Sequence, residues 1–230
     1  MLLLIGLVVF LYAFTSSKNL ARKVTNVEVE FVNNKYPFIT DENVSKLLIQ
    51  NKDSVTNVPK DILDLNELET ALNSNPIIKN AEVYMSVNGQ LTAKIEQKKP
   101  IARVSTNASY YIDDDGFYMP LSSNYSARVP LVTGQIEKNN LDNVFKVAKK
   151  IYKDEVLKKH VVEIHQNKDK TIYLKLRQNS FKVDLGNVKQ LDKKFDNLKA
   201  FYQKAIKDKT LNTYSKVNLQ FDNQVVCTKK

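Results

Sequence analysis

The residues that could carry out catalysis or bind metal are few and widely spaced in this 230-residue sequence. Its two histidines, His160 and His165, are predicted to lie on one strand and to point to opposite faces. They therefore lack the helical spacing of a zinc-binding histidine pair. The single cysteine, Cys227, allows neither an internal disulfide nor a cysteine-built metal cluster, and its surroundings indicate a small apolar side chain at a strand end. We predict no metal site and no cofactor.

An acidic run, Asp113 to Asp115 followed by Gly116, resembles the start of a calcium-binding loop. An EF-hand loop beginning at Asp113 would need glycine and glutamate where Tyr118 and Asn124 stand, so the match fails and a hairpin turn is predicted. The glycines are too scattered to build a phosphate-binding loop, and no G-x-S-x-G elbow is present. No catalytic motif is found, and we predict that the protein is not an enzyme.

The first hundred residues alternate in a pattern typical of a small α+β unit. A strand is predicted over residues 24–33, followed by two helices that begin after the capping residues Thr40 and Asp64. Two further strands flank Asn88 and Gly89, which together are a strong hairpin signal. The predicted order is strand, helix, helix, strand, strand.

Beyond Pro100 the pattern changes to short strands with helices at 141–152 and 188–205, which predicts a β-rich domain with helices on one face. The last predicted strand runs from Lys216 to Phe221 and is followed by a polar tail. Such a strand can lie at a sheet edge and accept a strand from another chain, or it can be an ordinary strand without a partner. The sequence leaves both possibilities open.

Residues 1–17 carry no charge, and Lys18, Arg22 and Lys23 follow them. A helix of this length spans about 25 Å, against about 30 Å for the hydrocarbon core of a bilayer. A signal peptide would need a basic start and a cleavage site of small residues. We therefore predict a membrane helix whose N-terminal end lies upstream of this sequence. The net charge of +10 comes from dispersed lysines, which indicate solvated faces rather than nucleic-acid binding.

The combination of one membrane helix, an α+β unit and a β-rich domain resembles the FtsQ/DivIB family of bacterial cell-division proteins. The motifs that carry the resemblance are Asn75–Val83, Leu91–Ile95, Lys99–Ala102, Ile112-Asp113 with Gly116, Val129–Gly134 and Leu219–Asp222.

The resemblance implies a transmembrane helix at 1–17, a linker at 18–23, a POTRA domain at 24–98, a β domain at 99–226 and a tail at 227–230. It implies a non-enzymatic divisome scaffold at the septum, in the cytoplasmic (inner) membrane with both domains outside it. The implied partners are FtsB and FtsL and, through them, the septal peptidoglycan synthases. Recruitment through the strand Ala81–Val87 is a further expectation. The alternatives are a POTRA protein of outer-membrane assembly or transport, and an extracytoplasmic enzyme.

In the family, the last strands of the β domain receive a segment of FtsB. The resemblance therefore implies a partner-binding edge strand, in which Phe221 would be an aromatic anchor. The matching positions are Lys216, Val217, Asn218, Leu219, Gln220, Phe221, Asp222 and Asn223.

Overall fold

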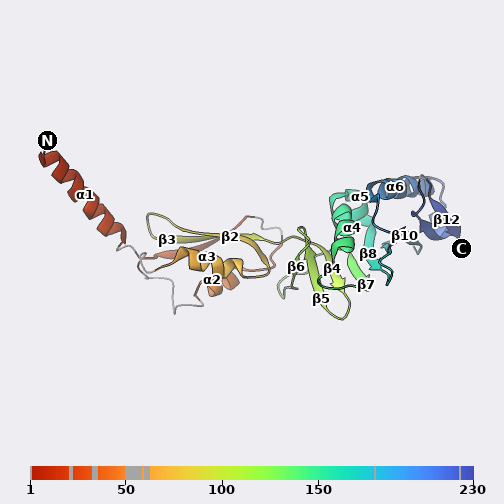
Figure 1. Ribbon diagram of the computed structural model, residues 1–230, viewed down its shortest axis with the longest axis horizontal. Helices are drawn as coiled ribbons and strands as arrows, with labels where there is room; N and C mark the ends of the chain where they lie inside the picture. Colours follow the sequence, from red (N-terminus) through yellow and green to blue (C-terminus); the bar gives the residue numbers. More distant parts are fainter. Residues whose placement is uncertain are drawn as a thin grey trace. The chain divides into compact units, whose positions relative to one another are not determined.

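The computed structural model describes residues 2–20, 23–32, 36–49, 59, 63–178, 180–222 and 224–230. The chain divides into two compact units, and the order of their elements can be followed in Figure 1. The first unit comprises residues 1–98 with 122–126, and the second comprises residues 99–121 with 127–230. Most of the polar segment predicted between Asn51 and Lys60 lies outside the described residues.

The chain starts with helix α1, Leu2–Leu20, which extends into the segment predicted as a linker. Its large apolar side chains from Leu4 to Phe14 are 50–77% exposed and contribute to neither core. In the described part of the chain, no helix has both the length and the apolar character required to cross a bilayer. The predicted transmembrane helix is therefore not confirmed.

The first unit has the predicted order of elements. Strands β1 (Asn26–Phe31), β2 (Ile78–Met85) and β3 (Gln90–Gln97) form a sheet in the order β1-β3-β2, with β1 parallel and β2 antiparallel to β3. Helices α2 (Asp41–Ile49) and α3 (Leu65–Asn73) lie between β1 and β2 in the sequence. The hairpin at Asn88-Gly89 is confirmed, with Gly89 at a φ of +88°.

Capping residues start both helices where the sequence predicted. The Thr40 hydroxyl accepts a hydrogen bond from the Asn43 N–H, and the Asp64 carboxylate accepts bonds from the Asn66 and Glu67 N–H groups. The apolar faces of the helices then bury Val44, Leu48, Leu68 and Leu72 with the inward side chains of β3, Leu91, Ala93 and Ile95. The α+β unit thus has one continuous core.

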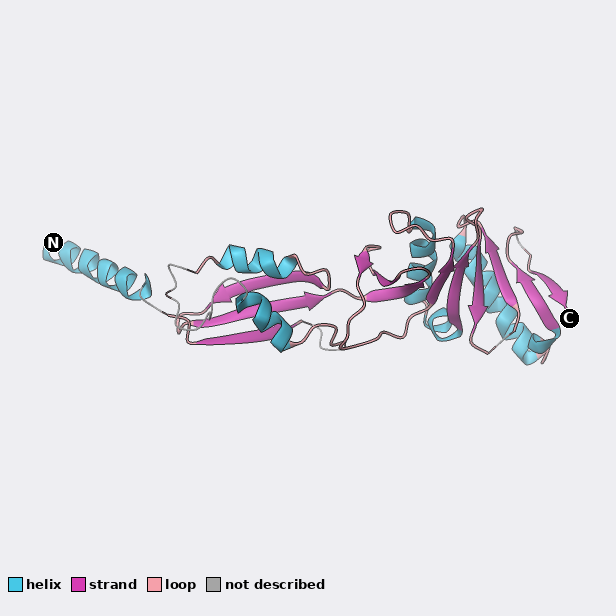
Figure 2. Cartoon of the chain, turned by 90° about the horizontal axis from the view of Figure 1, so that it is seen from below, coloured by secondary structure: helices cyan, strands magenta, loops and turns pink. Residues whose placement is uncertain are grey.

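The second unit is built on a nine-stranded sheet with the order β12-β11-β10-β9-β8-β7-β4-β5-β6. Helices α4 (Asp142–Lys153), α5 (Glu155–His160) and α6 (Leu191–Lys207) lie on one side of it, as Figure 2 shows. The strands are β4 Pro100–Ser105, β5 Ser109–Asp113, β6 Tyr118–Met119, β7 Leu131–Gly134, β8 Val161–Gln166, β9 Ile172–Leu176, β10 Lys182–Gly186, β11 Tyr214–Asn218 and β12 Val226–Lys229. The mixed α+β class and the β-rich character of this unit agree with the sequence prediction, whereas the assembly of its strands into one large sheet was not predicted.

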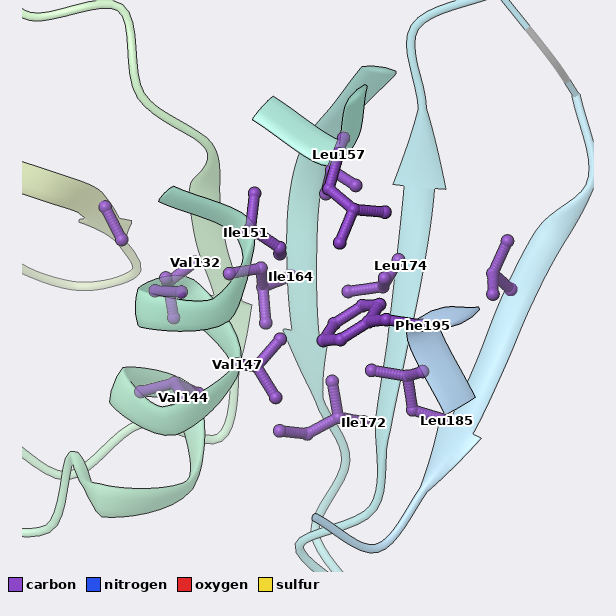
Figure 3. Close-up of a cluster of buried hydrophobic side chains, with 14 of the residues drawn as sticks. Val132, Val144, Val147, Ile151, Leu157, Ile164, Ile172, Leu174, Leu185 and Phe195 are labelled. Atoms are coloured by element: carbon purple, nitrogen blue, oxygen red, sulfur yellow. The ribbon is translucent and has the colours of Figure 1, made fainter. Parts of the chain in front are cut away.

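The core of this unit lies between the helices and the sheet. In Figure 3, Val147 and Ile151 of α4 lie next to Ile164 of β8, while Phe195 of α6 lies beside Leu174 of β9. These side chains are almost fully buried. The turn Asp113–Gly116 connects β5 and β6, so the predicted hairpin is confirmed.

The prediction for the two histidines was wrong. His160 ends helix α5 and His165 lies in strand β8, so the two histidines do not share a strand. Helix α5 was missed because its six residues carry little helical periodicity, and its start depends on the capping carboxylate of Asp154.

Candidate partner-binding edge

The edge of the large sheet differs from the prediction. The predicted last strand, Lys216–Phe221, is replaced by β11, which ends at Asn218 and lies between β10 and β12. Strand β12 uses Val226–Lys229, so residues 227–230 are mainly strand rather than tail. The candidate edge is therefore β12 and not the strand that contains Lys216.

The predicted site residues separate into three groups. Val217 and Leu219 are 0% and 1% exposed and belong to the core. Lys216 and Asn218 lie on the opposite face of the sheet from Val217, because successive strand residues alternate. The group after β11 consists of Gln220, Phe221 and Asp222, which are exposed, whereas Asn223 lies outside the described residues.

The direction of the backbone groups at the edge follows from two hydrogen bonds. The Leu219 N–H donates to the Asp184 carbonyl of β10 at 2.9 Å, so by alternation the N–H groups of Lys216 and Asn218 point toward β12. On β12, the Lys230 N–H donates to the Thr213 carbonyl at 2.9 Å. Cys227 stands opposite Val217 in the register, so its N–H and C=O point away from the sheet.

Side chains on the helix-free face form a cross-strand row beside this edge. Lys182, Lys216 and Thr228 are paired in register across β10, β11 and β12. The Lys216 ammonium forms an ion pair of 2.8 Å with Asp184. Phe221 is 48% exposed in the connection that leads to β12. The edge thus combines outward backbone groups with basic, polar and aromatic side chains.

A buried lysine that was not predicted from the sequence contacts the end of β10 and the residues that follow it. Lys194 of α6 is 8% exposed, and its ammonium donates to the carbonyls of Leu185 and Asn187, each at 2.7 Å. Burial lowers its pKa below the ordinary value, and attraction by Asp222 and Asp184 opposes this effect only in part. The available sequence signal was a lysine at a core-facing position of the α6 pattern, between Leu191 and Leu198.

Replacing Lys194 by methionine is expected to change how stability depends on pH. Because the pKa of Lys194 is lowered on folding, the unfolded chain binds more protons between the folded pKa and the ordinary value of 10.5. Stability of the wild type relative to Lys194→Met should therefore rise with pH across this interval. Urea unfolding of both proteins from about pH 8 to about pH 10.5 measures the difference. Parallel pH profiles would contradict the prediction.

A second polar cluster, on β7, β8 and β9, was tested as a catalytic arrangement. The Thr133 hydroxyl donates to Glu163 at 2.8 Å and lies 2.8 Å from His165 Nδ1. Its proton is directed to the carboxylate, so the imidazole is not placed to remove it. Burial lowers the pKa of His165, and Glu163 offsets only part of this effect. For Glu163, burial alone would raise the pKa, but hydrogen bonds from Lys175 and Thr133 hold it below its ordinary value.

The cluster therefore lacks the order of contacts of a nucleophile, a base and an orienting carboxylate. Within the described ranges, no group of three or more His, Cys, Asp or Glu side chains could hold a metal ion. Burial raises the pKa of the Cys227 thiol, which favours the protonated and less nucleophilic form.

Comparison with known proteins agrees with the two-unit architecture. Residues 22–96 match the family model described as a POTRA-like domain. Residues 99–228, more than half of the chain, match the model described as FtsQ/DivIB, C-terminal related. A search of curated proteins found no match. The first match lies within the first unit and leaves out α1, whereas the second match extends over nearly all of the second unit. The chain belongs to the FtsQ/DivIB family, a family of non-enzymatic scaffolds of bacterial cell division.

Proposed function

We propose that this protein is a divisome scaffold that binds FtsB and FtsL through the edge strand β12 and links them to septal peptidoglycan synthesis. The observation that carries the proposal is the edge itself. Strand β12 pairs with β11 on one side and turns the backbone groups of Cys227 outward on the other. An extended partner segment can complete its own hydrogen bonds on such an edge.

Side chains around β12 would select the partner. Val226 is 41% exposed, and Thr228, Lys229 and Lys230 are exposed beside it. A partner strand added here would place every second side chain on the same face as Lys216 and Thr228. Phe221 would contact the end of that strand as an aromatic anchor. Backbone pairing would supply affinity, while the lysines and Phe221 would supply specificity.

The experiment that tests this function is co-purification of FtsB and FtsL on the tagged full-length chain from the native cell. We expect both proteins to be recovered, and we expect their recovery to fall when residues 224–230 are removed. Recovery that is unaffected by this deletion would place the partner site elsewhere. Failure to recover either protein from wild-type cells would contradict the proposed scaffold role.

We also propose that α1 attaches the protein to the cytoplasmic membrane at the septum. Support comes from its apolar side chains, which are exposed from Leu4 to Phe14. Burying such side chains in lipid is favourable by about 25 cal/mol per Å² of apolar surface. Deleting Leu2–Leu20 is therefore expected to move the chain from the membrane fraction to the supernatant and to remove a fluorescent fusion from the septum. Unchanged fractionation would contradict attachment through α1.

A further inference from the structure

Strand β2 forms one edge of the three-stranded sheet of the first unit. Its register with β3 pairs Asn80, Glu82 and Tyr84 with Glu96, Lys94 and Thr92, and the Ser86 N–H continues this ladder by donating to the Gln90 carbonyl at 2.9 Å. The alternate residues therefore point their backbone groups away from β3. In most sheets such groups would be open to pairing with another chain.

In this protein, two side chains of α3 occupy those positions. The Asn73 amide oxygen accepts from the Ala81 N–H at 2.8 Å, and its amide nitrogen donates to the Ala81 carbonyl at 3.2 Å. A neighbouring strand would make the same pair of bonds through its own peptide groups. Glu69, which lies four residues earlier on the same helix face, accepts from the Val83 N–H at 3.2 Å. Asn73 thus acts as a substitute for one residue of an added strand.

Between Ala81 and Met85, β2 has neither the proline nor the lysine that commonly protects an edge, because its one lysine, Lys79, precedes this segment. The strand contains no proline, and its one register irregularity falls between Ile78 and Asn80, outside the segment that Asn73 and Glu69 cover. Tyr84 is 45% exposed on the outer face and favours strand pairing. The charge of Glu82 is balanced by Lys94, whose ammonium lies 3.7 Å away. The edge is therefore competent to pair once the α3 side chains leave it.

We propose that Asn73 and Glu69 close the β2 edge and so prevent two copies of this chain from pairing through β2. A second copy can pair with this edge about a two-fold axis at Glu82, which would set Ala81 of each copy opposite Val83 of the other. The same axis sets the two Glu82 carboxylates opposite each other, and each is offset by the Lys94 ammonium of its own copy. The outward donors and acceptors of Ala81 and Val83 would then satisfy one another. The same contacts mean that the predicted recruitment through Ala81–Val87 would require a partner to displace Asn73.

Cysteine cross-linking of the full-length chain tests the proposal. In a Cys227→Ser background, Glu82→Cys places one thiol at the two-fold axis, where paired Cα atoms lie about 4.5 Å apart, within disulfide range. Under mild oxidation, Asn73→Ala with Glu69→Ala is expected to raise the cross-linked fraction at least about tenfold, equivalent to about 1.4 kcal/mol. The matched control, Asn66→Ala with Glu67→Ala, removes the same two groups from positions on α3 that are exposed to solvent. It should leave cross-linking at the parent level.

The single substitution Asn73→Ser is a milder change and serves if the double variant does not fold. Serine is too short to reach both the N–H and the C=O of Ala81, so this variant also opens the edge. Hydrogen exchange of the Ala81 amide then reports whether the edge is open. Faster exchange together with more cross-linking supports the proposal. Faster exchange at an unchanged cross-linked fraction overturns it, because the edge would be open and still unpaired. Either result leaves the partner site at β12 untouched, since β12 belongs to the other unit.

Discussion

Replacing Gly134 by alanine is expected to destabilise the second unit by about 3 kcal/mol or more. Gly134 ends β7 at a φ of +90°, where an L side chain is strained. A Cβ built on it would lie 2.1 Å from the backbone oxygen of Gln166 and 3.0 Å from His165 Cε1. The Gln166 carbonyl also accepts from the Gln135 N–H at 2.9 Å, so it cannot move away without losing that bond.

Gly116 provides a closely matched control for this substitution. Its φ is +91°, but its added Cβ would meet carbon atoms of the Phe145 ring at 3.2 Å rather than a backbone oxygen. A side chain can shift by a few tenths of an ångström, so Gly116→Ala should cost only the backbone strain, about 1–2 kcal/mol. Urea unfolding followed by circular dichroism compares the two variants. Equal losses would mean that φ alone, and not the contact with Gln166, decides the effect.

Proline at position 227 is expected to weaken recovery of FtsB and FtsL at least about tenfold, a cost of about 1.4 kcal/mol. The β11–β12 ladder uses the pairs Asn218–Val226 and Lys216–Thr228, while the Cys227 N–H points outward. Proline removes this donor and is tolerated on an edge strand whose N–H faces solvent. The fold should therefore persist while partner pairing is lost.

Cys227→Ser is the matched control, because it retains the backbone N–H and approximates the size of the side chain. The Cys227 thiol is protonated, so the serine variant loses no charge. Phe221→Ala examines the side-chain contribution separately and should weaken binding without unfolding the domain. If Cys227→Pro and Cys227→Ser bind FtsB equally well while circular dichroism shows both folded, backbone pairing at β12 is excluded.

Local chemistry made much of the fold predictable. Thr40 and Asp64 supply helix caps, and Asn88-Gly89 supplies a hairpin turn, so these elements follow from a few neighbouring residues. Strand β12 was missed because its residues alternate only weakly. It is defined by pairing with β11 across the connection that contains Phe221. A strand of four residues has too short a pattern to identify without its neighbour.

The contacts of individual side chains could not be predicted from the sequence, because they also depend on how distant parts of the chain pack together. Lys194 is buried against Leu185 and Asn187, and Asn73 reaches Ala81, only because the backbone places these groups together. A lysine or an asparagine in a helix is ordinarily solvated. The position of Lys194 in the α6 pattern faces the core, but the pattern does not name the carbonyls that its ammonium meets. Asn73 is exposed, as Asn66 is, and its local pattern does not indicate the contact with Ala81.

The strand order of the large sheet has a consequence for the sequence of events during synthesis. From β7 onward, each strand is added beside the one before it, and β12 comes last in chain order. A chain that emerges N-terminus first therefore assembles eight strands before the ninth can pair. Until β12 pairs, β11 is the edge strand, and its outward backbone groups are those of Lys216 and Asn218. A chain released before Val226–Lys229 is synthesised would therefore lack the edge at which we propose that a partner docks.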